Sequence, residues 1–476
     1  MTDLVVVGAG IAGLIAGNRA AELGLGVLLL EAGDGVYENN SRFATGAMNF
    51  AHSDPMLPPD QLVKAIMADT EDHADPELSA AIAAVAARGL EWLQANGASF
   101  VRKEMQGKIS WVLAPQRVLA PGLDWRGKGS DMLLAELARR FEARGGTLVK
   151  GARGRRLVID NGRVAGVVVE VKGVEKTFAS HAVVIADGGF QADAELVREY
   201  ICKHPEKIVL RAAKAGFGDG IRMGEAAGAR LVDMNRFYGH LLSRDAFTNE
   251  KLWPYPTMDS LTGGGILVGA NGKRIFDEGL GGVTLANRLA GMDDPLSTWA
   301  VFDEEIWSTT GKDEVVASNP QYVEAGGTLY SAPTVAELAK KIGLPGDALA
   351  ATVEAYNRGV ESDPRKMDPP RTPGRRFGVL RNADRRIPVR PVTQAPYYAI
   401  PLAAGISCTM GGLCIDAKGR VKRPDGSAIA GLHAAGDAAG GVMGGPIAGY
   451  TGGLAHAFCT ALIAAESVAE EKRSGA

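Results

Sequence analysis

The feature that most constrains the fold lies near the N-terminus, where an apolar run meets a glycine-rich turn. Residues 4–7 read LVVV, the turn GAGIAG (8–13) follows, and residues 14–25 have the apolar spacing of a helix. A second apolar run, GVLLLEAG (26–33), completes the unit. Near-continuous apolar strands are typical of a parallel sheet covered by helices on both faces. The opening therefore predicts a βαβ unit of an α/β domain.

The glycines of this turn have the spacing of a dinucleotide site. Gly8, Gly10 and Gly13 lie between strand and helix, and Glu31 closes the second strand. Bare backbone and a helix N-terminus can hold a pyrophosphate, while the carboxylate accepts hydrogen bonds from ribose hydroxyls. The alternative is a tight turn with an unrelated surface Glu. Two more glycine-ended strands, at 182–189 and 431–437, with no second GxGxxG, favour FAD over a nicotinamide nucleotide.

Composition excludes several classes of protein. The 476 residues suffice for two or three domains. Lys and Arg number 52 against 55 Asp and Glu, so the net charge of −3 gives no reason to expect nucleic acid or an anionic membrane as a partner. The four cysteines lack metal-ligand spacing, and no run of about 18 apolar residues or signal peptide occurs. We therefore expect a cytoplasmic protein without metal that binds a small molecule.

A change of texture near residue 235 predicts a second domain. Trp, Tyr and Pro become frequent there, residues 348–360 predict a helix, and the Pro-rich segment 361–376 predicts an exposed loop. Glycine-rich sequence returns after residue 403. We therefore expect a discontinuous domain at 1–235 and 404–476, interrupted by a substrate domain at 236–403. Asn161-Gly162 between apolar runs predicts a β-hairpin in the first part.

Several longer motifs extend this interpretation. They are NNSRFATGAMN (39–49), GFGDGIRMGEAAGA (216–229), GGGILVGANGKRIFDE (263–278), APYYAI (395–400), CTMGGLCID (408–416) and GLHAAGDAAGGVMGG (431–445). In this order they resemble flavoproteins of the fumarate reductase and succinate dehydrogenase superfamily over almost the whole chain. The pattern is most similar to 3-ketosteroid dehydrogenases and tricarballylate dehydrogenases. The resemblance implies a Rossmann-like FAD domain interrupted by an α+β capping domain, with substrate between them.

The resemblance also implies which residues surround FAD. Gly8, Gly10, Gly13 and Glu31 would hold its ADP half. The remaining positions implied are Asn40, Ser41, Thr45 and Gly46 along the pyrophosphate and flavin, Asp187 and Gly188 near the adenosine, Asp437 at the ribityl or pyrophosphate, and Gly452, Gly453 and Leu454 where the last helix begins. Relatives with covalent flavin have a His in the segment matching 39–46. None stands here, so we expect non-covalent FAD.

The substrate-binding positions depart from those of the soluble fumarate reductases. His240 matches a substrate-binding His, whereas Ser407 and Cys408 precede Thr409 where the reductases have a His. We take Ser407, Cys408, Thr409 and Arg288 as candidate substrate contacts. Tyr450 falls near a carboxylate-binding Arg of the reductases. Gly282 stands at the position of their proton-donor Arg, four residues after Glu278.

A phenol in place of that Arg favours a carbonyl substrate. Tyr450 can donate one hydrogen bond to a carbonyl oxygen and stabilise enolate character, as the similar ketosteroid dehydrogenases imply. The alternative is a packed aromatic side chain whose hydroxyl binds backbone. His240 has a structural alternative too. Tyr238, Tyr255 and Tyr330 are further phenols that are more typical of packing, although one of them could be the missing base.

These observations predict an FAD-dependent dehydrogenase (desaturase). It would form a C=C bond adjacent to a carbonyl of a cyclic ketone or (poly)carboxylate, by α-proton abstraction and β-hydride transfer to flavin N5, with Tyr450 and His240 as catalytic residues. The electron acceptor is not indicated. One alternative is a fumarate-reductase-like ene-reductase acting on an α,β-unsaturated acid or ketone. Another is a non-catalytic flavin electron carrier.

Overall fold

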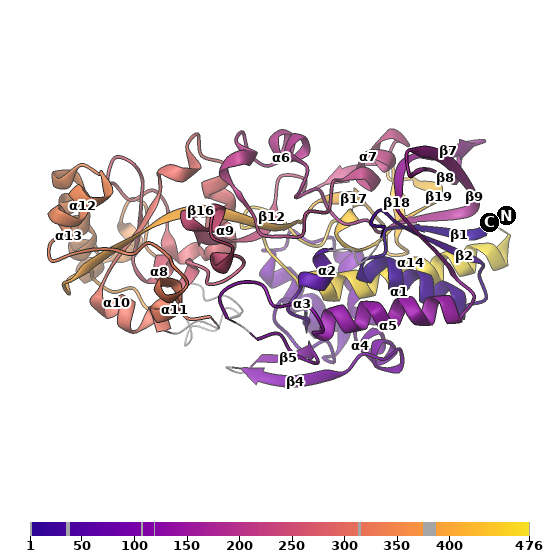
Figure 1. Ribbon diagram of the computed structural model, residues 1–476, viewed down its shortest axis with the longest axis horizontal. Coiled ribbons are helices and arrows are strands. Elements are labelled where there is room, and N and C mark those ends of the chain that lie inside the picture. The colour runs from indigo at the N-terminus through magenta and orange to yellow at the C-terminus, as the bar shows by residue number, and fades with distance from the viewer. Residues whose placement is uncertain are drawn as a thin grey trace.

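A computed structural model describes residues 2–34, 39–105, 108–118, 120–312, 316–374 and 387–475. These residues form an elongated molecule of two lobes (Figure 1). The terminal lobe, built on an eight-stranded sheet, carries both ends of the chain at its outer side. The distal lobe is built on a six-stranded sheet. The predicted α/β fold with an inserted α+β part is confirmed.

The terminal sheet begins with the predicted βαβ unit. Its order is β18-β19-β9-β1-β2-β6, in which β19, β9, β1, β2 and β6 run parallel, while β8 pairs with β9 and β7 with β8. The strands are β1 (Thr2–Val7), β2 (Val27–Glu31), β6 (Thr147–Lys150), β7 (Ala152–Asp160), β8 (Arg163–Val171), β9 (Val174–Ile185), β18 (Arg420–Lys422) and β19 (Ala428–Ala434). The predicted hairpin turns at Asn161 and Gly162, whose φ angles are 48° and 79°. Parallel strands end at one edge of the sheet, so the first glycine turn comes to lie beside the ends of β9 and β19.

Helices pack against this sheet through apolar faces that are nearly continuous. α1 (Ile11–Glu22) buries Leu14 and Ile15 completely, and it packs beside the long C-terminal α14 (Gly453–Ser474). The other helices of the lobe are α2 (Asn40–Phe43), α3 (Pro59–Asp69), α4 (Pro76–Ala95) and α5 (Gly129–Ala143). Asp75 caps α4 by accepting from the backbone N–H of Leu78. Gly97, with φ of 97°, follows its end.

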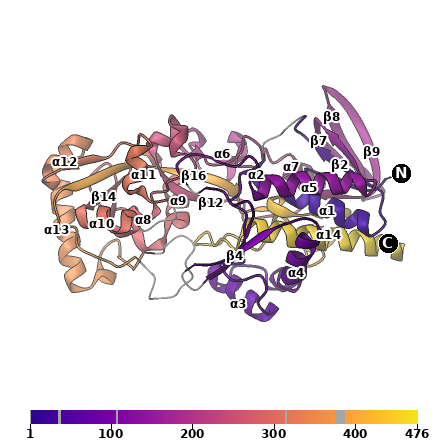
Figure 2. The ribbon, with the colours of Figure 1, turned by 60° about the horizontal axis from the view of Figure 1, so that its bottom comes forward.

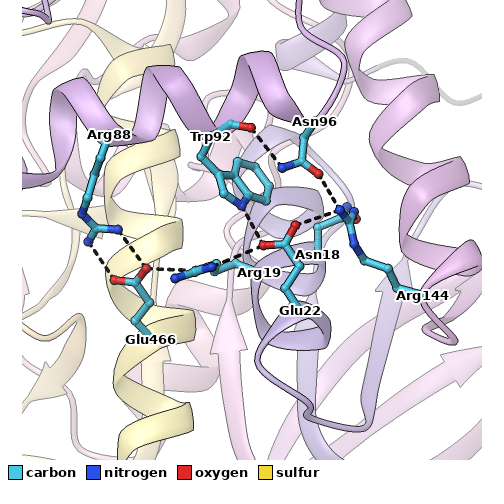
Figure 3. A network of polar contacts seen from close by, with 8 residues as sticks. All are labelled: Asn18, Arg19, Glu22, Arg88, Trp92, Asn96, Arg144 and Glu466. Atoms are coloured by element: carbon cyan, nitrogen blue, oxygen red, sulfur yellow. Dashed lines mark hydrogen bonds and ion pairs between the residues drawn. The ribbon is translucent and has the colours of Figure 1, made fainter.

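A polar network joins α1, α4 and α14 (Figure 3). Its members are Asn18, Arg19, Glu22, Arg88, Trp92, Asn96, Arg144 and Glu466. Glu466 of α14 accepts from Arg88 of α4 at 2.7 and 2.9 Å and from Arg19 of α1 at 2.9 Å. Glu22 accepts from the indole N–H of Trp92 at 2.7 Å. The network therefore fastens three helices that come from distant parts of the chain.

The distal lobe is organised by one long strand, β16 (Tyr397–Thr409), which pairs with four others and runs from the far end of this lobe to the boundary between the lobes (Figures 1 and 2). Its partners and their neighbour are β10 (Val209–Leu210), β12 (Phe237–Ser243), β13 (Ile266–Val268), β14 (Trp299–Asp303) and β15 (Tyr330–Ala332). The helices here and at the boundary are α6 (Ala194–Tyr200), α7 (Asp219–Ala226), α8 (Asp259–Gly264), α9 (Gly282–Ala290), α10 (Glu304–Ser308), α11 (Ser318–Glu324), α12 (Val335–Ile342) and α13 (Gly346–Ser362). The predicted helix at 348–360 lies within α13.

Two small three-stranded sheets complete the architecture. They consist of β3 (Ala47–Met48), β5 (Lys108–Leu113) and β4 (Phe100–Met105), and of β11 (Leu231–Val232), β17 (Gly412–Cys414) and β20 (Ala439–Gly440). The four cysteines are free and buried. None of the described helices has both the length and the apolar composition needed to cross a membrane.

Each lobe has its own hydrophobic core. The distal core includes Phe190, Leu196 and Val209, which precede the boundary expected at residue 235. The domain boundaries drawn from the sequence stay a prediction. The exposed loop expected at 361–376 is wrong at Arg371 and Gly374, which are buried, and at residues 361–362, which belong to α13. The Arg371 guanidinium lies 3.6 Å from the buried Glu278 carboxylate and donates to the Gly263 carbonyl oxygen. Residues 375–376 of that segment lie outside the described residues.

Candidate active site

A cavity of 1280 Å³ is lined by residues of both lobes. Single drug-sized ligands occupy clefts of about 300–1,000 Å³, so this space is large enough for a cofactor together with a small substrate. The phenols Tyr238 and Tyr255 line it, as do fifteen of the predicted site residues: Gly8, Gly10, Glu31, Asn40, Ser41, Thr45, Asp187, Gly188, Ser407, Cys408, Asp437, Tyr450, Gly452, Gly453 and Leu454. The cavity has two ends of different construction, which we call the nucleotide end and the substrate end.

The nucleotide end, around the turn 8–13 and Asp187, is shaped by backbone. Gly8 has a φ of 99°, and a Cβ there would lie 2.5 Å from the Asp187 Cα, so only glycine fits. A Cβ on Gly13 would lie 1.8 Å from the Gly8 carbonyl oxygen, which explains why Gly13 supports the turn from behind rather than lining the cavity. The backbone N–H of Ile11, at the start of α1, donates to the Ser41 hydroxyl at 3.1 Å. Ser41 is thereby fixed at a helix N-terminus, where anions bind.

Two carboxyl groups face this end. Glu31 accepts from the backbone N–H of Ala9 at 3.0 Å and of Gly33 at 2.8 Å, and burial raises its pKa. Asp187 accepts from the backbone N–H of Gly220 at 2.7 Å through Oδ2, while its buried Oδ1 has no hydrogen-bond partner among the described residues. Burial raises the pKa of Asp187 to about 7. A buried oxygen without a donor fits a ligand hydroxyl.

The segment 40–46, which consists of α2 and the turn after it, connects the two lobes. Asn40 donates to the Ser407 carbonyl oxygen at 2.8 Å and accepts from the Ala213 backbone N–H at 3.0 Å. Thr45 lines the cavity next to Gly46, which has a φ of 86° and packs against Leu113 outside the lining. The local turn therefore carries the chain from the nucleotide end toward the substrate end.

The first turn of α14 closes the middle of the cavity. The helix begins at Gly453, as predicted, so its positive end points into the cavity. Asp437 lies nearby, and burial raises its pKa to about 6 although the Cys408 thiol donates to it. The same burial raises the pKa of Cys408 well above its usual range, so Cys408 is a neutral thiol donor rather than a nucleophile.

At the substrate end two tyrosines are stacked. The rings of Tyr238 and Tyr450 lie 3.7 Å apart at an interplanar angle of 15°. The backbone N–H of Gly453 donates to the Tyr450 hydroxyl at 2.7 Å. A Cβ on Gly453 would lie 2.9 Å from that hydroxyl, so glycine permits the approach. Burial raises the pKa of both phenols, which keeps them protonated.

Tyr238 belongs to a chain of polar side chains that leads away from the cavity. Its hydroxyl lies 3.0 Å from His240 Nε2, and His240 Nδ1 lies 2.6 Å from Asp259 Oδ2. A carboxylate accepts, so Nδ1 carries the proton and Nε2 accepts from Tyr238. Burial lowers the pKa of His240, which favours this neutral tautomer. Asp259 also accepts from the Leu241 backbone N–H at 2.9 Å, which fixes its position.

Gly282 is part of the same arrangement. A Cβ at this position would lie 1.9–2.1 Å from the three atoms of the Asp259 carboxyl group. Any larger side chain would occupy the space that Asp259 needs to reach His240. Gly282 and the pair Asp259–His240 are therefore sterically linked, which explains in physical terms why the position holds no Arg.

The other predicted substrate contacts separate in space. Ser407 accepts from Arg211 Nη1 at 2.7 Å on the cavity wall. Thr409 is fully buried behind the wall and accepts from the Phe190 backbone N–H at 3.3 Å. Arg288 is not among the described residues that line the cavity, and its guanidinium lies over the Phe276 ring at 5.5 Å. His240 also lies behind the wall and reaches the cavity through Tyr238.

Sequence reasoning did not single out three residues of this end: Arg117, Arg211 and Asp259. All three are buried, and the two arginines line the cavity. No group of His, Cys, Asp and Glu that could hold a metal ion occurs in the described part of the chain.

The residues at the nucleotide end fit FAD: a turn that admits only glycine, a helix N-terminus, and a buried Asp187 oxygen to which no residue in the described part of the chain donates. The chain matches a model of the FAD binding domain family over residues 3–451. It belongs to that family. Its cofactor is FAD. Gly8, Ser41, Glu31 and Asp187 are the residues positioned to hold the nucleotide half.

Proteins similar in sequence to this chain bear the names of different reactions. The NADH:acrylate oxidoreductase of Vibrio harveyi is 29% identical over 364 residues, which is 73% of this chain and 32% of that protein. The 4-oxocyclohexanecarboxylate 2-dehydrogenase of Sinomonas cyclohexanicum is 31% identical over 325 residues, 64% of this chain and 54% of that protein. The chain thus spans about a third of the length of the first of these relatives and just over half of the second.

A solved structure shares the fold over the whole length. The 3-ketosteroid delta1-dehydrogenase from Sterolibacterium denitrificans superposes with a TM-score of 0.78 at 19% identity and covers 99% of both chains. The identity is low, so this likeness concerns the fold alone.

Proposed function

We propose that this chain is an FAD-dependent dehydrogenase that forms a carbon–carbon double bond next to the carbonyl group of a small cyclic ketone or carboxylic acid. One observation carries the proposal: the two stacked phenols at the substrate end, Tyr238 and Tyr450, are each backed by a different partner. One phenol is suited to donate a hydrogen bond to the substrate, and the other is suited to pass a proton on to its own partner. An electron carrier without substrate chemistry has no use for such a pair.

Tyr450 is suited to hold the carbonyl oxygen. Its pKa is raised by burial, so its hydroxyl keeps a proton to donate. The Gly453 N–H donates into that hydroxyl from the N-terminus of α14, so a negative charge that develops on the substrate oxygen is stabilised through the phenol. The α-proton of the substrate becomes more acidic as a result.

Tyr238 is suited to take that α-proton. Burial disfavours a standing Tyr238 phenolate, so the phenolic proton must leave as the α-proton arrives. His240 Nε2 lies 3.0 Å away and accepts it, and the imidazolium formed is stabilised by Asp259. Tyr238 therefore acts as the base that touches the substrate, while His240 and Asp259 act through it. Bound FAD supplies the oxidation, since a flavin accepts a hydride from the carbon beside the one that loses its proton.

The relatives support opposite directions of this chemistry. One bears the name of a dehydrogenase of an oxocyclohexanecarboxylate, the other that of an NADH:acrylate oxidoreductase. We favour the dehydrogenase because Gly282 stands where the resemblance implies the proton-donor Arg of the reductases, and a side chain at this position would meet the Asp259 carboxyl group. The ene-reductase remains the second candidate, on the strength of the acrylate relative.

The first experiment is to mix the oxidised protein anaerobically with cyclic ketones and carboxylic acids and to follow the flavin band near ~450 nm. We expect bleaching by a saturated ketone or acid. If none bleaches the band, but an α,β-unsaturated compound reoxidises the chemically reduced protein, the direction is that of a reductase.

Two variants test the roles of the phenols. Tyr238→Phe and Tyr450→Phe should each lower the rate of flavin reduction by about 100-fold or more, since a positioned acid or base contributes that much, and should leave the FAD spectrum in place. Tyr330→Phe is the matched control, because Tyr330 lies edge-on to Trp299 in the distal lobe. An unchanged rate in Tyr238→Phe would remove Tyr238 as the base.

Three finer points stay predictions under this proposal. FAD is held without a covalent bond, which release of free FAD by acid precipitation would test. The location is cytoplasmic, and the reduced flavin passes its electrons to an acceptor that a panel of dyes and quinones would identify.

A further inference from the structure

A buried arginine lies on the wall of the substrate end. Arg211 follows β10 and is only 9% exposed. Its Nε donates to the Pro254 carbonyl oxygen at 3.0 Å, its Nη1 donates to the Ser407 hydroxyl at 2.7 Å, and its guanidinium lies over the Tyr255 ring at 4.9 Å. Three uncharged groups therefore hold the guanidinium in one orientation.

The charge of Arg211 has no carboxylate opposite it. No ion pair joins Arg211 to an Asp or Glu of the described residues, whereas Arg153, on the same cavity, pairs with Asp219 at 2.6 Å. Arg117, also on the wall, donates to the carbonyl oxygens of Phe43 and Asp124 and to no carboxylate among the residues that the structure describes. Burying a guanidinium is costly unless an anion compensates it. The two buried arginines therefore favour the binding of an anionic ligand at this wall.

The position of Arg211 indicates which part of a ligand it meets. Its backbone N–H donates to the Ile406 carbonyl oxygen at 2.7 Å, and β10 and β12 flank β16 on opposite sides there. Two strand spacings place the backbone of Arg211 about 10 Å from that of Tyr238. The Arg211 charge lowers the pKa of Tyr238 and Tyr450, although burial outweighs it, while the cation that acts on Glu31 is Arg42. Arg211 thus acts at the substrate end rather than on the nucleotide.

We propose that Arg211 binds a carboxylate of the substrate, so that the site takes a ring ketone that bears a carboxylate group away from its carbonyl. This inference rests on the proposed function, in which Tyr450 holds the carbonyl. The guanidinium keeps donors on Nη1 and Nη2 for a carboxylate, and planar paired donors suit that group. Arg117 adds positive charge on the same wall. A neutral ring ketone would leave both charges buried and uncompensated.

The test compares two probes in flavin reduction, 4-oxocyclohexanecarboxylate and its uncharged carboxamide. Arg211→Met should lower kcat/KM for the carboxylate by about 100-fold, through KM, and change that for the carboxamide by less than about 3-fold. Arg211→Lys keeps the charge but not the paired donors and should lose about 10-fold for the carboxylate. Arg244→Met is the matched control, because Arg244 also lies over an aromatic ring, Trp299 at 4.4 Å, but not on the cavity wall. It should behave like the unaltered protein.

A binding measurement separates this inference from the proposed function. Cyclohexanecarboxylate contains no ketone to oxidise, yet it should perturb the flavin spectrum of the holoenzyme, and Arg211→Met should abolish that perturbation. If both hold without turnover of any ketone, the proposed function fails and the carboxylate site stands. If Arg211→Met lowers kcat/KM for both ketone probes equally, or for neither, Arg211 does not recognise a carboxylate. FAD content and thermal midpoint show that each variant is folded.

Discussion

The two ends of the cavity are built by opposite means. At the nucleotide end the space exists because side chains are missing: Gly8 and Gly13 let a strand, a turn and a helix approach to within contact of one another. At the substrate end the space is defined by side chains that are present, Tyr238, Tyr450 and Arg211, and by the partners that fix them. The nucleotide end depends on the course of the backbone, whereas the substrate end depends on the protonation and charge of its side chains.

This difference teaches which changes each end tolerates. A methyl group added at the nucleotide end must move main chain of two strands, so it acts on folding and FAD binding. A change at the substrate end moves a hydrogen bond between side chains, so it acts on turnover while the fold persists. Substitutions of similar size at the two ends should therefore fail in different ways.

The largest effect is expected at Gly8. In Gly8→Ala the new Cβ would lie 2.5–2.7 Å from backbone atoms of Ala186 and Asp187, at a φ of 99°. We expect a loss of more than about 4 kcal/mol in the free energy of unfolding and little bound FAD. Gly24→Ala is the control, because Gly24 also has a positive φ of 85° but nothing within 4 Å of its Cβ. It should cost roughly 1–2 kcal/mol. Similar losses in both, measured by urea unfolding, would show that close approach at Gly8 is unimportant.

The next effect tests the other end with the same chemical change. Gly282→Ala places a Cβ 1.9 Å from the Asp259 carboxyl carbon, so Asp259 must leave His240. We expect the rate of flavin reduction to fall by about 100-fold while FAD stays bound. Gly291→Ala, just beyond the other end of α9, is the control, since its Cβ would meet nothing closer than 3.6 Å. Retained activity in Gly282→Ala would show that Asp259 does not act on Tyr238 through His240.

The same contrast decides what the sequence could predict. The nucleotide end depends on residues close together in the chain, so the spacing of Gly8, Gly10 and Gly13 predicts its turn, and Glu31 follows at the end of the next strand. The start of α14 at Gly453 and the hairpin at Asn161 follow from local rules of the same kind. Each of these patterns involves residues that lie close together in the chain.

The substrate end depends on pairings that no local pattern encodes. Tyr238 lies opposite Cys408 because β12 pairs with β16, and its ring stacks on Tyr450, which lies far along the chain in the segment before α14. Arg211 reaches Ser407 because β10 lies on the other side of β16. A single sequence shows an Arg after a short apolar run, which is common on protein surfaces. Asp259 offers no pattern either, since its role depends on the space left by Gly282.

A smaller effect is expected in the pH dependence of the apoprotein, prepared by removing FAD. Burial raises the pKa of Asp187 to about 7 from an ordinary 3.8. Between about pH 4 and pH 7 the unfolded chain has lost this proton while the folded chain still holds it. The stabilisation that is fully present at low pH is therefore lost as the pH rises through about 7. We expect the free energy of unfolding of the apoprotein to fall by about 2 kcal/mol between pH 5 and pH 8.

Asp187→Asn should remove most of that slope, because an amide at this position has no proton to lose and can still accept from the Gly220 N–H. Asp437 contributes in the same direction, since burial raises its pKa to about 6, so a residual slope is expected. The measurement is urea unfolding of both apoproteins at several pH values. Parallel curves for the two would mean that Asp187 is ionised in the folded chain, and the nucleotide end would then depend on charge as well as on backbone shape.

The smallest effect is expected outside the cavity, in the network that fastens the helices behind the nucleotide end (Figure 3). Glu466→Gln removes the charge that Arg19 and Arg88 share, at distances of 2.7–2.9 Å, on a partly exposed surface. Water screens such pairs, so the free energy of unfolding should fall by only about 1 kcal/mol, with FAD content and turnover unchanged. Urea unfolding and flavin reduction measure the two quantities on one preparation. If turnover falls while stability holds, the helices transmit their arrangement to the substrate end, and the separation between the two ends of the cavity is incomplete.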